Sequence, residues 1–144
     1  MDAADDEAAI KTLIEGFAQA IRARDIDAVM AVFAPDVVSF DLGPPLRHRG
    51  GEVFADRWRA LFDSYAGPID YDVRELDITA GGDIAFSHSL NHTRGMSRDG
   101  RPIDRWLRWT AGYRKRDDRW RIVHEHVSVP ADLREGKAVL DLAP

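Results

Sequence analysis

The first half of the chain carries three stripes of apolar residues at helical spacing. The first stripe consists of Ile10, Leu13, Ile14, Phe17 and Ile21. Asp25 can cap a second, shorter helix that Pro35 ends. A third, strongly aromatic stripe lies between Gly50-Gly51 and Gly67-Pro68 and consists of Phe54, Trp58, Leu61, Phe62 and Tyr65. The pattern therefore predicts three helices, of which the first two form a hairpin.

The spacing of apolar residues changes to alternation in the rest of the chain. Short runs cover 37–42 and 69–79, and long runs cover 84–96, 102–116 and 120–129. Short turns separate the long runs, which predicts an antiparallel meander. Helices placed before a long curved sheet indicate an α+β fold, with the three N-terminal helices packed on the concave face and the aromatic third helix covering it.

The length of the chain is that of one domain with a single core. We expect this domain to occupy residues 1–130 of the 144 residues. The tail, residues 131–144, contains four apolar side chains, which are Leu133, Val139, Leu140 and Leu142. The tail packs on the body, packs on a neighbouring subunit, or is disordered.

Charge and composition narrow the classes of partner. The net charge of −5 opposes binding to the phosphates of nucleic acids. No apolar run approaches the length that crosses a bilayer, and the N-terminus is acidic where a secretory signal would be basic. We therefore expect no nucleic-acid or membrane partner and a cytoplasmic location. The chain has no cysteine, which excludes thiolate chemistry and leaves any metal to histidines and carboxylates.

The order of these elements resembles a known superfamily. Phe33-Ala34-Pro35-Asp36 leads into a strand, and a glycine precedes the aromatic helix. In these features nearly the whole chain resembles the nuclear transport factor 2-like superfamily, specifically its SnoaL-like and ketosteroid isomerase-like members. The segment 120–130 is also similar to the last strand of the association domain of calcium/calmodulin-dependent kinases.

The resemblance implies a cone-shaped roll with a pocket between the helices and the sheet. It also implies a small-molecule ligand, no cofactor, and a homodimer formed through the outer face of the sheet. The superfamily includes isomerases, cyclases, dehydratases, binding modules and assembly hubs, so the fold alone does not fix a function.

Asp41 is the first candidate for a catalytic residue. It ends the run 37–42, and in the resemblance to the ketosteroid isomerases it falls on the position of their proton-shuttling aspartate. Independently, a carboxylate at the mouth of an apolar pocket loses solvation and becomes a stronger base for a carbon acid beside a carbonyl. The alternative is a strand-end aspartate bonded to the Gly43-Pro44 turn.

The oxyanion donors of the ketosteroid isomerases have no counterpart in this sequence. Their tyrosine on the first helix and their protonated aspartate on a late strand fall on Phe17 and, approximately, on Trp109. Phe17 has no donor, and Trp109 has only an indole N–H. Because oxyanion donors stabilise the transition state, the sequence argues against true steroid isomerase activity.

His88 and His92 lie on the more apolar side of the run 84–96, together with Phe86 and Leu90. We expect this side to face inward. His88 would then supply the missing donor or a second proton relay, because histidine titrates near neutral pH, and His92 would line the pocket. The alternative for each is a histidine at the edge of the core that bonds a backbone carbonyl.

Arg105 shares an expected inner face with Trp109, so it would enter the pocket and clamp an anion. The alternative is a salt bridge with Glu125, Asp104 or Asp41. Trp58 and Phe62 belong to the aromatic helix face, where we expect core positions that partly line the pocket.

The last strand has two faces, and either can point inward. One face holds Trp120, Ile122, His124, His126 and Ser128, and the other holds Val123, Glu125, Val127 and Val129. The resemblance favours Val123, Glu125 and Val127 inside. Glu125 would then be a second pocket carboxylate, and the histidines would lie on the dimer-forming side.

His124 and His126 lie about 7 Å apart on one strand face, close enough to share a metal ion. The sequence places no acidic residue as an obvious third ligand. We therefore expect hydrogen-bonded histidines at an interface and no metal site.

Two classes of function remain open at this point. The first is a cofactor-independent isomerase, lyase or cyclase that acts on a small, mainly apolar carbonyl compound, with Asp41 as general base and His88 or Arg105 as electrophile. The second is a non-catalytic ligand-binding or oligomeric association module of the same fold. Asp41 and the aromatic pocket favour the first class, which is our leading hypothesis. The missing oxyanion donors and the last strand similar to that of the kinase association domain favour the second class.

Overall fold

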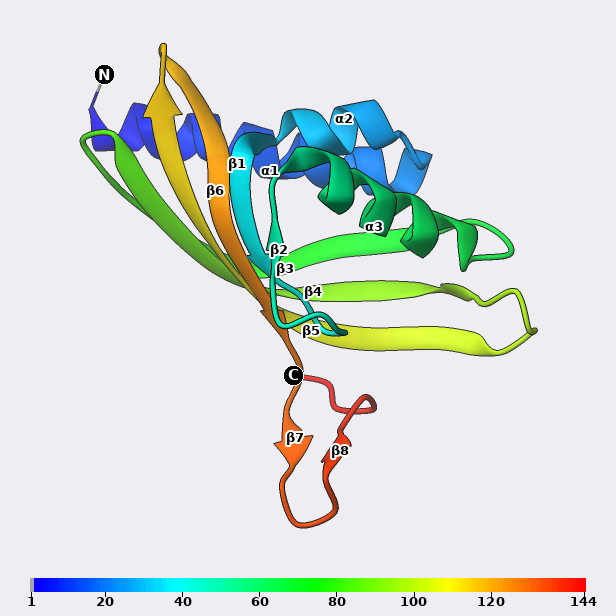
Figure 1. Cartoon of the computed structure of the whole chain (residues 1–144). Coiled ribbons are helices and arrows are strands. Elements are labelled where there is room, and N and C mark those ends of the chain that lie inside the picture. The colour runs from blue at the N-terminus through cyan, green and yellow to red at the C-terminus, as the bar shows by residue number, and fades with distance from the viewer. Residues whose placement is uncertain (1) are drawn as a thin grey trace.

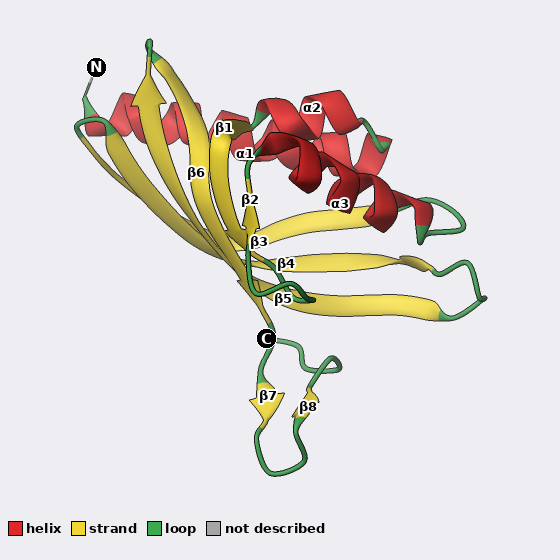
Figure 2. Cartoon of the chain, viewed as in Figure 1, coloured by secondary structure: helices red, strands yellow, loops and turns green. Residues whose placement is uncertain are grey.

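The computed structural model describes residues 2–144, in which three helices lie on one side of a curved six-stranded sheet (Figures 1 and 2). The helices are α1 (Ala3–Ala23), α2 (Ile26–Ala31) and α3 (Gly51–Asp63). The strands of the sheet are β1 (Phe33–Phe40), β2 (His48–Arg49), β3 (Asp70–Gly81), β4 (Ile84–Met96), β5 (Pro102–Arg116) and β6 (Arg119–Ser128).

The three predicted helices are confirmed, with a shorter second helix. The Asp25 carboxylate accepts a hydrogen bond from the backbone N–H of Ala28 at 3.1 Å, as expected of an N-cap. Pro35 lies within β1 rather than at the end of α2, because Phe33 already pairs with Ile122 of β6. The chain therefore leaves the helix earlier than the apolar spacing indicated.

The predicted antiparallel meander is confirmed and is part of a mixed sheet. The strand order is β2-β1-β6-β5-β4-β3. β3, β4, β5 and β6 pair antiparallel in succession, whereas β1 runs parallel to β6. The connection between β1 and β6 therefore encloses the whole meander and brings the N-terminal strand beside the C-terminal one.

The predicted α+β cone-shaped roll is confirmed, but the helices divide the concave face differently from the prediction. α1 packs along β3 and also contacts β6, while α3 contacts β1 and β2. Phe17 of α1 stacks on Trp109 of β5 with 5.3 Å between ring centroids. The third helix thus closes one end of the cone, because α1 already occupies the floor of the concave face.

A buried ion pair anchors the start of α1 to the β5–β6 hairpin. Asp6 is 3% exposed and accepts hydrogen bonds from the indole Nε1 of Trp120 at 3.1 Å and from the Lys115 Nζ at 3.2 Å. Lys115 also lies over the Trp120 ring. One carboxylate therefore connects the first helix to two strands near the end of the chain.

The C-terminal tail forms a small hairpin that projects from the body (Figure 1). Its strands are β7 (Ala131–Asp132) and β8 (Lys137–Ala138), and Leu133 in its turn is 89% exposed. The three alternatives for the packing of the tail stay predictions. In residues 2–144 no helix combines the length and the apolarity needed to cross a membrane.

Candidate functional site

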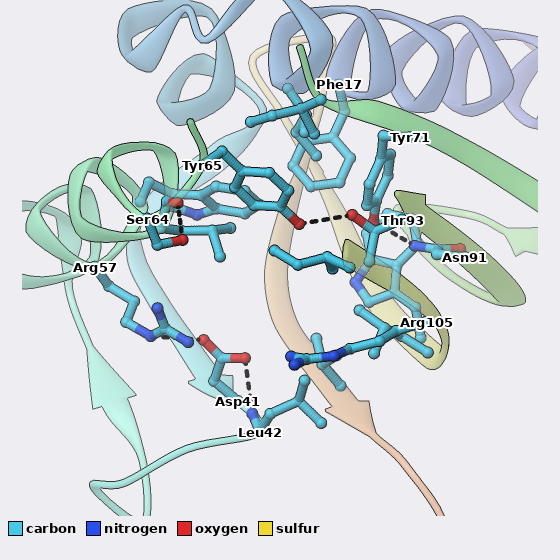
Figure 3. A pocket seen from close by; sticks show the side chains of 18 of the residues that line it. Phe17, Asp41, Leu42, Arg57, Ser64, Tyr65, Tyr71, Asn91, Thr93 and Arg105 are labelled. Atoms are coloured by element: carbon cyan, nitrogen blue, oxygen red, sulfur yellow. Dashed lines mark hydrogen bonds and ion pairs between the residues drawn. The ribbon is translucent and has the colours of Figure 1, made fainter. Parts of the chain in front are cut away.

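A cavity of about 160 Å³ lies between the helices and the inner face of the sheet (Figure 3). The predicted site residues that line it are Phe17, Asp41, Trp58, Arg105, Trp109, Glu125 and Val127. Leu61, Tyr71 and Leu107 add to its largely apolar wall. A cavity of similar volume in another protein holds one benzene molecule, so this one suits a ligand with a single ring.

The prediction for the inner face of β4 is wrong. Ser87, Ser89 and Asn91 are buried, whereas His88 is exposed and does not line the cavity. His92 also lies on the outer face, where its ring stacks on Trp106 with 4.2 Å between centroids. Neither histidine can therefore act on a ligand in this cavity.

The apolar pattern of β4 predicted the wrong inner face because the polar side chains of the true inner face are hydrogen-bonded within the protein. The Ser89 hydroxyl donates to the Asn91 Oδ1 at 2.7 Å, and the Ser87 hydroxyl lies 2.8 Å from that of Tyr113. Because buried polar groups with hydrogen-bond partners cost little free energy, the face with more polar residues can be the buried one. Ser87 bonds Tyr113 of β5 and Asn91 bonds Tyr71 of β3, so the sequence of β4 alone could not reveal the buried face.

Two tyrosines that the sequence did not single out as site residues place hydroxyl groups at the cavity (Figure 3). The Tyr65 hydroxyl lies 3.0 Å from the Oγ1 of Thr93, and the Tyr71 oxygen accepts a hydrogen bond from the Asn91 Nδ2 at 2.6 Å. Burial raises the pKa of Tyr71, so its hydroxyl stays protonated. Because the oxygen accepts from Asn91, the hydroxyl hydrogen is left for a ligand.

A bulge at Val123 decides which residues of β6 face the cavity. Gly112 of β5 lies opposite His124 and Tyr113 lies opposite Ile122, so Val123 has no partner on β5. The extra residue reverses the alternation of side chains along the strand.

Both faces proposed for the last strand are therefore partly right. Trp120 and Ile122 are buried before the bulge, whereas Glu125 and Val127 line the cavity after it. The prediction that the resemblance favoured is confirmed for Glu125 and Val127 and wrong for Val123, because the bulge turns Val123 outward.

Glu125 places a buried carboxyl group in the cavity wall. It is 3% exposed, and its two oxygens accept hydrogen bonds from the Ser39 hydroxyl at 2.7 Å and from the Trp109 indole N–H at 3.0 Å. Burial raises the pKa of Glu125 to about 7, against the effect of these two hydrogen bonds, and the charge of Asp41 adds to the rise. Glu125 can therefore exchange a proton near neutral pH.

Asp41 lies at the mouth of the cavity and is paired with a cation (Figure 3). Its Oδ2 is 3.1 Å from the Nε of Arg57, and its Oδ1 accepts the backbone N–H of Leu42 at 2.7 Å. The alternative of a bond to the Gly43-Pro44 turn is thus replaced by a bond to Leu42. Asp41 faces the ligand space as predicted, but as half of an ion pair.

Arg105 also reaches the mouth of the cavity, as its predicted face requires (Figure 3). The salt bridge considered for it does not form with Asp41, which pairs with Arg57, or with Asp104, which pairs with His92. Nor does it form with Glu125, whose oxygens accept from Ser39 and Trp109. Its guanidinium therefore remains available to an anionic group of a ligand.

The remaining candidates have structural surroundings. Phe62 is buried against Trp58 with 5.8 Å between ring centroids and does not reach the cavity surface. The His124 Nδ1 lies 2.7 Å from the carbonyl oxygen of Val38, and His126 is exposed. Across residues 2–144, no group of three His, Cys, Asp or Glu side chains is arranged to hold a metal ion.

Comparison with known proteins gives the same fold throughout. The family model described as a SnoaL-like domain matches residues 10–132. A nuclear transport factor 2-like protein of unknown function from Pseudomonas putida KT2440 is 33% identical, with 99% of each chain covered and a TM-score of 0.90. A comparison with curated proteins found no match.

More distant structures share the fold alone. A ketosteroid isomerase-like protein from Erwinia carotovora atroseptica SCRI1043 is 21% identical over 84% of this chain and 93% of its own, with a TM-score of 0.72. A proposed dehydratase of the nuclear transport factor 2-like family from Streptomyces avermitilis is 14% identical over 88% and 97%, with a TM-score of 0.78. The match to the domain model and the 33% identity over nearly the full length decide the family. The chain therefore belongs to the SnoaL-like family of the nuclear transport factor 2-like superfamily.

Proposed function

We propose that this protein is a cofactor-independent enzyme that moves a proton within a small, mainly apolar carbonyl compound. The observation that carries the proposal is the Glu125 carboxyl, which is buried in the wall of an aromatic cavity and has a pKa of about 7. A base with this pKa is half ionised near neutral pH, where it both accepts and returns protons. A ketosteroid isomerase-like protein and a proposed dehydratase share the fold, which supports a proton-transfer reaction.

The proposed reaction begins with proton transfer to Glu125 from a carbon beside the substrate carbonyl. The electrons of the C–H bond move onto the carbonyl oxygen, which becomes an enolate. The Tyr71 hydroxyl donates to this oxygen, since Asn91 occupies the acceptor side of the tyrosine. In an isomerisation, the proton then returns from Glu125 to another carbon. In an elimination, the enolate electrons re-form the carbonyl and expel a leaving group, which takes the proton from Glu125.

Trp109 does not serve as the oxyanion donor in this scheme, because its indole N–H bonds Glu125. Instead it holds the carboxyl group in place together with Ser39. The tyrosine hydroxyl thus takes the role for which the sequence offered only Phe17 and Trp109.

The earlier assignment of Asp41 as general base remains a second version of the proposal. Asp41 faces the same cavity, but its two oxygens are already engaged by the Arg57 Nε at 3.1 Å and the Leu42 N–H at 2.7 Å. We therefore assign proton transfer to Glu125, and we assign the Asp41–Arg57 pair and Arg105 to orienting the substrate at the mouth.

The experiment is hydrogen–deuterium exchange followed by NMR. The protein is incubated in D₂O with a panel of one-ring ketones, and loss of the proton signal beside the carbonyl is measured for each. Glu125→Gln should slow the exchange by about 10²–10⁴-fold, because it removes the proton acceptor but keeps the side-chain size. Glu15→Gln, the same change on an exposed part of α1, should leave the exchange rate unchanged.

Comparison with Asp41→Asn separates the two versions of the mechanism. Equal exchange in Glu125→Gln and in the unchanged protein, with loss in Asp41→Asn, would transfer the role of base to Asp41. Ketones that bind without exchanging a proton would favour the binding module, which the fold equally accommodates.

The proposal includes a homodimer formed through the outer face of the sheet. Large apolar side chains are exposed on this face, with Phe40 39%, Ile84 57% and Phe86 50% exposed. Burial of such side chains against a second copy removes apolar surface from water. The cytoplasmic location and the lack of nucleic-acid or membrane partners stay predictions from composition.

A further inference from the structure

A second cavity, of about 230 Å³, lies outside the cone near the β5–β6 turn. We call it the arginine cavity. Its lining consists of Ala34, Pro35, Arg114, Arg116, Asp117, Arg119, Arg121 and Val123. It has none of these residues in common with the candidate active site, so its role is independent of the proposed function.

The arginine cavity arises where two strands lose their regular pairing. Phe33 pairs with Ile122 and the next paired residues are Val38 and His124, so four residues of β1 face a single residue of β6. That single residue is Val123, which is also the bulge toward β5. The two irregularities part the strands on the outer face and leave the space that Pro35 and the arginines surround.

Four arginines face one another across this cavity. Arg114 lies directly opposite Arg121, and Arg116 lies directly opposite Arg119. Like charges in directly opposed positions on neighbouring strands destabilise a sheet. Such an arrangement is favourable only when negative charge is supplied between them.

The chain supplies only part of that negative charge. Asp36 binds Arg116 through two hydrogen bonds of 3.0 and 3.3 Å, and these lower the pKa of Asp36, with Arg114 adding to the effect. Within residues 2–144, no carboxylate lies within 4 Å of the guanidinium groups of Arg114, Arg119 and Arg121. The Nε of Arg121 is buried, and it has no hydrogen-bond partner among residues 2–144.

We infer that the arginine cavity binds a phosphate group. Guanidinium groups donate two parallel hydrogen bonds to phosphate oxygens, and phosphate carries enough negative charge to balance more than one of them. A phosphate between Arg114, Arg119 and Arg121 relieves the repulsion across the two strands and satisfies the buried Nε of Arg121. The phosphate group belongs to a free inorganic ion or to a phosphate ester.

Isothermal titration calorimetry at fixed ionic strength tests this inference. The probes are inorganic phosphate and adenosine 5′-monophosphate, with adenosine as the phosphate-free control. We expect saturable binding of at least one phosphate-bearing probe and none of adenosine. Binding of inorganic phosphate identifies a free ion as sufficient, whereas binding of the monophosphate alone identifies an ester.

Two variants and a control locate the binding. Arg121→Gln and Arg114→Gln should each weaken phosphate binding by about tenfold, since each removes a charge-assisted hydrogen bond. Arg134→Gln, on the exposed C-terminal hairpin, should leave the affinity unchanged. Thermal unfolding without phosphate should show a Tm for Arg121→Gln that is no lower than that of the unchanged protein, because a repulsive pair is removed.

Three results would overturn the inference. One is a lack of saturable binding of both phosphate probes by the unchanged protein. Another is equal affinity in Arg121→Gln and Arg114→Gln. The third is that no probe binds and that sedimentation velocity shows an oligomer for the unchanged protein but not for one of the two variants. The arginines would then contact the acidic side chains of a second copy. None of these results depends on catalysis in the other cavity.

Discussion

Glu125 couples the proposed chemistry to the stability of the fold. The pKa of Glu125 is about 7 in the folded protein, where the carboxyl is buried, and 4.5 in the unfolded chain, where it is exposed. Between these two pH values the folded chain therefore keeps a proton that the unfolded chain has released. The free energy of unfolding should therefore fall by about 3 kcal/mol as pH rises from 4.5 to 7, and should then level off.

Urea unfolding at several pH values measures this contribution. The difference in unfolding free energy between the unchanged protein and Glu125→Gln isolates the titration of this one group, because all other groups are shared. A difference that stays constant from pH 4.5 to 8 would contradict the raised pKa.

Single residues were predicted well where their neighbours along the strand were apolar. The inner face of β5, with Arg105 and Trp109, follows from alternation alone. The inner face of β4 does not follow from alternation, because Asn91 is buried there with hydrogen bonds to Ser89 and to Tyr71. Hydrophobicity cannot report a buried polar group whose partners are distant in sequence.

At the scale of elements, Asp6 holds the first helix against the β5–β6 hairpin. Asp6→Ala leaves the Trp120 indole N–H and the Lys115 amine without their acceptor. We expect the Tm to fall by roughly 5–10 °C, because a buried ion pair loses one partner.

Asp5→Ala is the matched control, since Asp5 is exposed on the same turn of α1. It should change the Tm by much less than Asp6→Ala in the same calorimetric scan. Equal effects would mean that charge at the start of the helix, rather than the buried contact, stabilises this end of the molecule.

The elements themselves follow closely from the sequence. The strand limits of β4 and β5 coincide with the alternating runs 84–96 and 102–116, and the cap at Asp25 is formed as predicted. The bulge at Val123 could not be predicted, because either face of β6 offers a similar set of apolar side chains. Only pairing with β5 decides where the extra residue lies.

For the whole molecule, the exposed apolar residues of the outer sheet face predict self-association. A double variant, Ile84→Lys with Phe86→Glu, places charges at two positions of this face, where the native side chains are 57% and 50% exposed. Sedimentation velocity should show a dimer for the unchanged protein and a monomer for the variant, because charges resist burial in an apolar interface.

Circular dichroism checks that the double variant keeps its fold, which we expect because both side chains point away from the core. A monomer in both proteins would exclude the outer face as a stable interface. A dimer in both would assign the contact to another surface, with the C-terminal hairpin as the next to test.

The single unpaired residue at Val123 has a consequence for how this fold diversifies. With regular alternation from Ile122, the chamber would receive His124 and His126, and Glu125 would point to solvent. Loss of the bulge with every residue retained would thus exchange an acid for two imidazoles, whereas deletion of Val123 itself would keep Glu125 in the chamber. Reactivity in this architecture is inherited through the register of strand pairing as much as through side-chain identity.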